Sequence, residues 1–214
     1  MGWKTSKVGT QTGGLMSHSP KSGQSPGADR SVRIIAGQWR GRRIPFQPVP
    51  GLRPTPDRVR ETLFNWLQRA VVGCRGLDLY AGTGALGFES LSRGAAEAVL
   101  VEKDPIVVRQ LLQAATLLGA SQATVVQADA GVYLSGPVRP FDLVFLDPPF
   151  ALGALTELCT LLDVRGWLAP TAWIYLEQSA RDALPDLPVG WQLLKETRAG
   201  EVRALLARRE EGSR

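Results

Sequence analysis

Histidine, cysteine and long apolar runs are all scarce in this chain of 214 residues. Its single histidine, His18, lies in a polar segment, so histidine-based acid–base catalysis is excluded. The two cysteines, Cys74 and Cys159, form no CxxC pair and no Cys/His cluster, which predicts no metal site and a reducing, cytoplasmic setting. No apolar run reaches the roughly 18 residues of a membrane span, so we expect no membrane partner.

Positive charge is concentrated at the front of the chain. Residues 1–60 contain eleven Lys and Arg residues and two acids, Asp29 and Asp57, whereas residues 61–214 contain more acids than bases. A basic front segment on a mildly acidic body is typical of a polyanion contact confined to one region. We expect three parts: a disordered basic and polar tail over 1–30, a hairpin and linker that contact RNA over 31–56, and the main domain over 57–214.

A short hairpin is predicted by two strand-like runs, 32–36 and 42–46, that flank a turn with glycine at both corners. Near the turn, an aromatic ring and guanidinium groups offer base stacking and phosphate contact, which favours RNA. The predicted RNA-binding residues are Trp39, Arg40, Arg42, Arg43 and Arg53. The alternative is an edge hairpin kept soluble by its charge. Farther on, Arg58 and Arg60 are either RNA contacts or charges on a helix surface.

The body of the chain alternates between strand-like and helix-like patterns. This alternation predicts an α/β fold with a doubly wound sheet, whose ligand crevice lies at the carboxyl ends of the strands. We expect strands at 77–80, 98–102, 123–126, 141–146 and 172–176, helices near 59–70, 85–92, 106–118 and 152–162, and a closing antiparallel hairpin from 191–197 and 202–208.

A glycine-rich loop follows the first predicted strand. Gly82, Gly84 and Gly87 match G-x-G-x-x-G, which permits a tight turn and close approach of a ligand. This spacing alone also occurs in dinucleotide enzymes. Asp78, however, suits a cationic amine better than a pyrophosphate, and Glu102 ends the next strand, where an acid can accept both hydroxyls of a ribose.

An adenosine that carries an amino acid in place of phosphates is S-adenosyl-L-methionine, which is therefore the expected cofactor. Asp129 could accept from the adenine amine, or it could equally cap the helix that begins at residue 130. The predicted cofactor-binding residues are Asp78, Ala81, Gly82, Gly84, Glu102 and Asp129.

The predicted catalytic residues are Asp147, Pro148, Pro149 and Phe150, directly after the buried strand 141–146. Two prolines hold the backbone extended and offer no N–H, so the carbonyls and the Asp147 carboxylate are left as acceptors. The Phe150 ring would stack on a planar group. This combination suits the exocyclic amine of a base, flipped from a helix or taken from a loop.

These motifs together resemble the RsmD family, which methylates N2 of a guanine in 16S ribosomal RNA. The resemblance extends over about 32–209 and is most specific in Ile34–Arg42 and Leu52–Thr55. It implies a Rossmann-like seven-stranded methyltransferase sheet with an N-terminal β-hairpin extension. The implied partner is 16S rRNA or a small-subunit assembly intermediate, and the enzyme is expected to be a monomer.

Two other enzyme classes share part of this pattern. An N6-adenine methyltransferase, on DNA or RNA, would use the same amine-binding motif. An NAD-binding oxidoreductase would share the glycine spacing only. The third alternative is a non-catalytic RNA-binding protein that kept the fold.

Overall fold

The computed structural model describes residues 5–7 (backbone only), 30–50, 54–149 and 154–210. Their main feature is one twisted sheet in the order β1-β6-β5-β4-β7-β8-β10-β9. Its strands are β1 (Thr5–Lys7), β4 (Arg75–Asp78), β5 (Glu97–Glu102), β6 (Ala123–Gln127), β7 (Phe141–Leu146), β8 (Leu168–Ser179), β9 (Trp191–Ala199) and β10 (Val202–Glu210). The helices are α1 (Asp57–Trp66), α2 (Ala85–Ser92), α3 (Pro105–Leu118), α4 (Ala130–Leu134) and α5 (Leu155–Val164).

The sheet is doubly wound, and the expected seven strands are present. β4 pairs in parallel with β5 on one side and with β7 on the other, so the chain changes direction across the sheet between β4 and β7. β10 lies between β8 and β9 and is antiparallel to both, which confirms the closing hairpin. One addition was not foreseen: β1 pairs antiparallel with β6, although the tail was predicted to be disordered.

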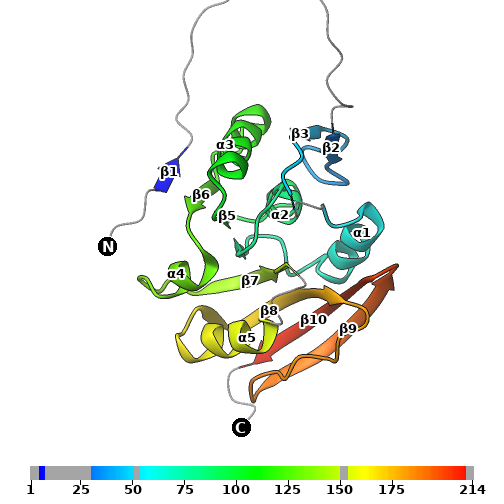
Figure 1. Cartoon of the computed structure of the whole chain (residues 1–214), viewed down its shortest axis with the longest axis vertical. Coiled ribbons are helices and arrows are strands. Elements are labelled where there is room, and N and C mark those ends of the chain that lie inside the picture. Colours follow the sequence, from blue (N-terminus) through cyan, green and yellow to red (C-terminus); the bar gives the residue numbers. More distant parts are fainter. Residues whose placement is uncertain (1–4, 8–29, 51–53, 150–153, 211–214) are drawn as a thin grey trace, which may run out of the picture.

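Helices cover both faces of the sheet (Figure 1). α1, α2 and α3 lie on one face, and α4 and α5 on the other. Side chains alternate along each strand, so Phe145 and Tyr175 belong to the first core, whereas Leu146 and Ile174 belong to the second. Within the described residues, no helix is both long enough and apolar enough to cross a membrane.

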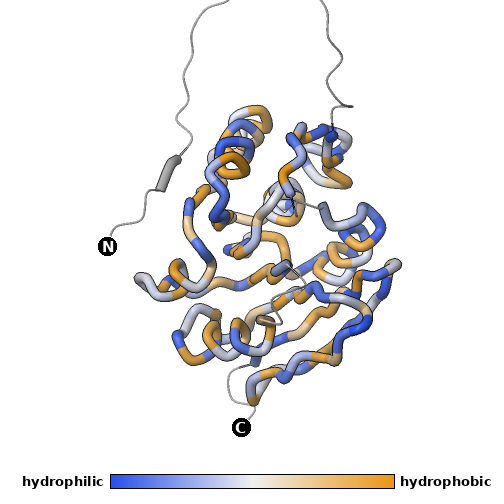
Figure 2. Tube along the Cα trace, in the orientation of Figure 1, coloured by the Kyte–Doolittle hydropathy of each residue, from blue (hydrophilic) through white to orange (hydrophobic). Residues whose placement is uncertain are grey.

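The caps of α3 show how local sequence sets the helix boundaries. The Asp104 carboxylate accepts the N–H groups of Ile106 (2.7 Å) and Val107 (3.3 Å), and Pro105 occupies the first helical position. Gly119 ends the helix in the left-handed conformation. Between the caps, hydrophobic and hydrophilic residues alternate in Figure 2, as expected for a helix with one face on the core.

The hairpin predicted from the sequence is present as a separate two-stranded sheet, β2 (Arg30–Arg33) and β3 (Arg43–Phe46). It packs against α2, where Val32 and Phe46 contact Ala85. Its turn contradicts one expectation, because Trp39 is only 7% exposed and lies in the first core. The backbone passes very close to α2 at Gly37, where a Cβ would lie 1.7 Å from the Ser92 carbonyl oxygen. Because its indole is buried in the core, Trp39 offers no exposed face for stacking on an RNA base.

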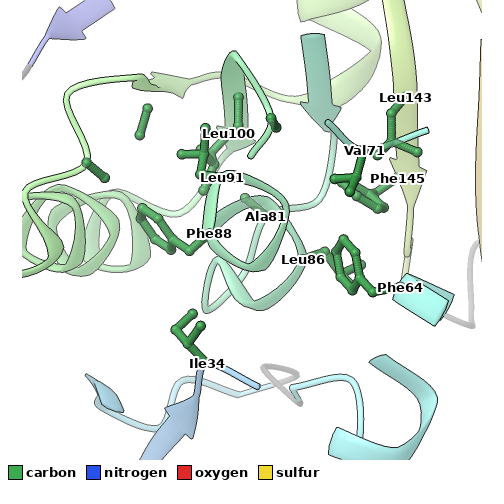
Figure 3. Close-up of a cluster of buried hydrophobic side chains, with 14 of the residues drawn as sticks. Ile34, Phe64, Val71, Ala81, Leu86, Phe88, Leu91, Leu100, Leu143 and Phe145 are labelled. Atoms are coloured by element: carbon green, nitrogen blue, oxygen red, sulfur yellow. The ribbon is translucent and has the colours of Figure 1, made fainter. Parts of the chain in front are cut away.

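One buried carboxylate attaches the hairpin to the body. Glu89 on α2 is fully buried and accepts the backbone N–H groups of Ile35 (2.8 Å) and Ala36 (3.0 Å). Arg60 is also fully buried and lies 3.5 Å from the same carboxylate. Arg60 is therefore neither an RNA contact nor a surface charge. Figure 3 shows the apolar side of this junction, where Ile34 of the hairpin lies near Phe88 of α2.

Candidate active site

The carboxyl ends of β4 and β7 meet at the point where the strand order reverses. Asp78 ends β4 and is in register with Phe145, two residues before Asp147. Phe145 is in turn in register with Tyr175 of β8. In open α/β sheets, ligands bind in the crevice outside such a switch point. The structure thus brings the ends of the two predicted motifs to one edge of the sheet.

The glycine loop wraps tightly around the start of α2. Gly84 caps the helix with φ of 76°, and a Cβ at this position would lie 2.4 Å from the Phe88 ring. A side chain here would therefore be strained and would collide with the core. The Gly82 N–H donates to the Glu102 carboxylate at 3.1 Å, which fixes the loop against the end of β5. Ala81, also on this loop, donates its N–H to the Val101 carbonyl.

The Asp78 carboxylate is buried beneath this loop. It is 2% exposed and accepts the Gly87 N–H at 3.1 Å. Burial raises the pKa of Asp78 to about 7; the Gly87 hydrogen bond opposes the shift, and the nearby Glu102 charge adds to it. Among the described residues, no Lys or Arg pairs with it. A buried carboxylate without a cation is suited to a cationic ligand group.

The other two predicted cofactor acids have structural contacts of their own. Glu102 accepts the Asp104 N–H at 2.9 Å in addition to that of Gly82. Asp129 caps α4 by accepting the Gly131 N–H at 2.9 Å, which is the capping role left open by the sequence. Each carboxylate retains lone pairs for further donors.

On the opposite side of the switch point, Asp147 lies beside two polar residues, Thr55 and Glu177, that the sequence analysis did not predict as site residues. Thr55, just before α1, lies beside both Asp147 and Glu177, where its hydroxyl opposes the rise in the pKa of each carboxylate. The Tyr175 hydroxyl donates to Glu177 at 2.7 Å. Burial, followed by the charges of Glu177 and Asp78, raises the pKa of Asp147 well above its usual value. Burial likewise raises the pKa of Glu177, although hydrogen bonds from Tyr175 and Thr55 oppose the shift.

Both missed residues left a signal in the sequence. Glu177 directly follows the apolar run that ends at Leu176, just as Asp147 follows Leu146. Thr55 belongs to the Arg-Pro-Thr segment on which the resemblance rests. Of the predicted catalytic residues, Pro148 is buried and Pro149 is exposed. Phe150 and the predicted RNA-binding Arg53 lie outside the described residues.

The predicted RNA-binding arginines differ in the hydrogen bonds that their side chains already make. Arg40 is exposed at the hairpin turn. Arg43 is exposed and donates to the Ser31 hydroxyl at 3.2 Å. Arg42 donates to the carbonyls of Leu117 and Leu118 at the end of α3. Its positive charge there also interacts favourably with the dipole of the helix. Arg42 therefore fastens the hairpin to α3, and its guanidinium group is already engaged.

The chain is similar to known proteins in both sequence and fold. A family model described as conserved hypothetical protein 95 matches residues 32–208. The protein named ribosomal RNA small subunit methyltransferase D of Escherichia coli (strain K12) is 49% identical over 179 residues, which are 84% of this chain and 90% of that protein. The chain belongs to the RsmD family.

A second relative and a solved structure are also similar to this chain. The protein of the same name in Haemophilus influenzae is 44% identical over 183 residues, covering 84% of this chain and 94% of that protein. The solved Escherichia coli yhhF chain superposes with a TM-score of 0.78 at 45% identity, covering 85% of this chain and 99% of that one. As an RsmD family member, the chain is an S-adenosylmethionine-dependent methyltransferase with a Rossmann-like fold.

Proposed function

We propose that this enzyme methylates the exocyclic N2 amine of one guanine in 16S ribosomal RNA. The observation that carries the proposal is the position of Asp147, at the switch point beside the buried Asp78. The names of the relatives from Escherichia coli and Haemophilus influenzae support ribosomal RNA of the small subunit as the polymer. Guanine N2 follows from the RsmD resemblance described above.

The residues around the glycine loop fit S-adenosylmethionine. Asp78 would bind its cationic amine, Glu102 would accept from the ribose hydroxyls, and Asp129 would accept from the adenine amine. Gly82 and Gly84 both have positive φ, a conformation that glycine adopts without strain, so the loop can turn tightly and its backbone would approach the ligand. When bound, this cofactor supplies a methyl group already activated by a sulfonium charge.

The acceptor side of the crevice positions the amine. The lone pair of an exocyclic base amine is delocalised into the ring, so the amine is a weak nucleophile. Asp147 and the carbonyl of Pro148 would accept the two amine hydrogens and stabilise the positive charge that develops on the nitrogen. Phe150 would stack on the base plane. The enzyme's contribution is therefore alignment and charge stabilisation rather than activation of the methyl group.

A basic cavity marks the proposed RNA contact at the hairpin. It measures about 370 Å³ and is lined by Arg33, Arg40 and Arg93, together with Glu61 and Asn65. Guanidinium groups at such a cavity suit phosphate oxygens. We therefore assign RNA contact to the exposed arginines of the hairpin rather than to Trp39.

Replacing Arg40 and Arg43 together by alanine should weaken RNA binding and lower the slope of log K against log salt by about two. The free energy of unfolding should remain within about 0.5 kcal/mol of the wild type, because both side chains are exposed. Filter binding across a salt series measures the slope. Arg42→Ala serves as the contrasting variant, with a clear loss of stability. An unchanged slope in the Arg40/Arg43 variant would place the RNA elsewhere.

Cofactor affinity should rise with pH up to about 7. The ammonium group of the ligand favours ionised Asp78, whose pKa burial raises to about 7, so below that pH binding must also remove a proton. The Kd of S-adenosylhomocysteine, which carries the same amine, should fall by up to about tenfold per pH unit between pH 5.5 and 7. Calorimetric titration measures the slope.

Two variants test the assignment to Asp78. Asp78→Asn should bind the ligand weakly and lose the pH slope, because the amide does not titrate in this range. Asp129→Asn should retain the slope. Equal slopes in the wild type and in Asp78→Asn would refute the assignment of the amine to Asp78.

Product mapping tests the function as a whole. Small-subunit RNA, free or in partly assembled particles, is incubated with the enzyme and labelled S-adenosylmethionine, and the modified nucleoside is identified by mass spectrometry. The expected product is N2-methylguanosine at a single position, formed far more slowly by Asp147→Ala. N6-methyladenosine as the only product would instead establish the adenine alternative.

A further inference from the structure

A cavity of about 180 Å³ opens next to Pro148 at the carboxyl ends of β7 and β8. It lies between the exit of β7, the start of α5 and the segment after β8, and its lining includes Pro148, Pro149, Leu155, Glu177, Gln178 and Leu184. The Gln178 amide donates to the Ala183 carbonyl at 2.8 Å, which holds that segment against β8. The lining is mostly apolar and includes two acidic residues, Glu177 and Asp182, a composition suited to a site that encloses a planar base.

Glu177 is the buried carboxylate of this cavity, whereas Asp182 is exposed. It is 4% exposed, and within the described residues no Lys or Arg forms an ion pair with it. Burying an unpaired carboxylate is costly unless donors approach it. The Tyr175 hydroxyl supplies one donor, at 2.7 Å, and fixes the orientation of Glu177. A carboxylate has about four lone-pair sites, so acceptor capacity remains for a ligand.

Glu177 and Asp147 are neighbours on one face of the sheet. Phe145 is in register with Tyr175, and each carboxylate follows two residues later, where a side chain returns to the same face. The charge of Glu177 also contributes to the raised pKa of Asp147, as expected for two neighbouring carboxylates. When the exocyclic amine of a base lies against Asp147, the ring nitrogen next to that amine therefore lies against Glu177.

The bases that carry an exocyclic amine differ in that adjacent atom. In guanine the ring nitrogen beside the N2 amine is N1–H, a donor. In adenine and cytosine the ring nitrogen beside the amine is an acceptor, which a carboxylate would repel. We infer that Glu177 accepts the N1–H of the target guanine, while Asp147 accepts from N2, and that Glu177 thereby selects guanine. This inference rests on the proposed function and assigns its base specificity to a residue outside the Asp-Pro-Pro-Phe motif.

A base analogue distinguishes the role of Glu177 from that of Asp147. 2-Aminopurine keeps the N2 amine but has an acceptor at N1. Placed at the mapped target position of a synthetic RNA, it should be methylated by the wild type with kcat/KM at least about 100-fold below that of guanine, because a site built to accept an N–H rejects an analogue without it. In Glu177→Gln the amide can donate to N1, so activity on guanine should fall and activity on 2-aminopurine should rise.

The measured quantity is the ratio of kcat/KM for the two RNAs, and Glu177→Gln should lower it at least tenfold. Glu157→Gln, an exposed change on α5, should leave the ratio unchanged. An unchanged ratio in Glu177→Gln would show Glu177 to be structural. If the Gln variant fails to fold, wild-type methylation of both RNAs at equal rates would still overturn the inference. Failure of the wild type to methylate the guanine RNA would instead refute the proposed function.

Discussion

Replacing Asp147 by alanine should lower turnover by about 100- to 1000-fold while the affinity for S-adenosylhomocysteine changes by only a few fold. The size of the loss is that of one charge-stabilising group removed from an enclosed site. The affinity is preserved because the proposed partner of Asp147 is the base amine, whereas the ligand amine is assigned to Asp78. Single-turnover kinetics and calorimetric titration measure the two quantities separately.

Asp147→Asn is the matched variant for this prediction. It keeps the shape and one acceptor oxygen but removes the charge, so we expect an intermediate loss. Equal loss of turnover and cofactor affinity in Asp147→Ala would show that the residue acts structurally.

The pH dependence of turnover gives an independent readout of the same site. Burial raises the pKa of both Asp147 and Glu177, and only the ionised carboxylates accept hydrogen bonds fully. In the wild type kcat should therefore increase with pH as these carboxylates lose their protons. Asp147→Asn should shift this dependence, since one of two interacting groups is gone.

Replacing Glu89 by alanine should destabilise the protein by about 3–5 kcal/mol, the range expected when one partner of a buried ion pair is removed. Arg60 would remain buried, and within the described residues its hydrogen bonds are to Asp57 and the Arg33 carbonyl. The N–H groups of Ile35 and Ala36 would lose their acceptor. For a domain of this size, the melting temperature should fall on the order of 10 °C.

Two controls accompany the Glu89 prediction. Glu157→Ala, an exposed change on α5, should alter stability by less than about 0.5 kcal/mol. Glu89→Gln retains an acceptor and should lie between the wild type and Glu89→Ala. If Glu89→Ala unfolds at the same denaturant concentration as the wild type, the hairpin does not depend on this carboxylate.

Most strands and helices could be predicted because their signals are local. The run 141–146 became β7 without change, and Asp104, Pro105 and Gly119 marked the ends of the α3 segment. The acids at the carboxyl ends of parallel strands could also be predicted to converge, since the fold places these ends at one edge. Asp78 and Asp147 were found in this way.

The hairpin shows why exposure could not be predicted. Trp39, Arg42 and Arg60 lie in a segment rich in arginine, and their neighbours in sequence indicate a charged surface. In the structure Trp39 packs into the core, Arg42 binds the end of α3, and Arg60 is buried beside Glu89. Burial depends on which element covers a residue, and α2 and α3 are distant in sequence.

By itself, the sequence determined a doubly wound sheet, a glycine loop with acids beside it, and an amine-binding motif after β7. Only the tertiary structure decided that Thr55 and Glu177 join Asp147. The three residues come from segments separated by many residues, and neither periodicity nor spacing encodes their meeting. Their proximity follows from strand register and from the packing of the segment before α1, both of which are properties of the folded chain.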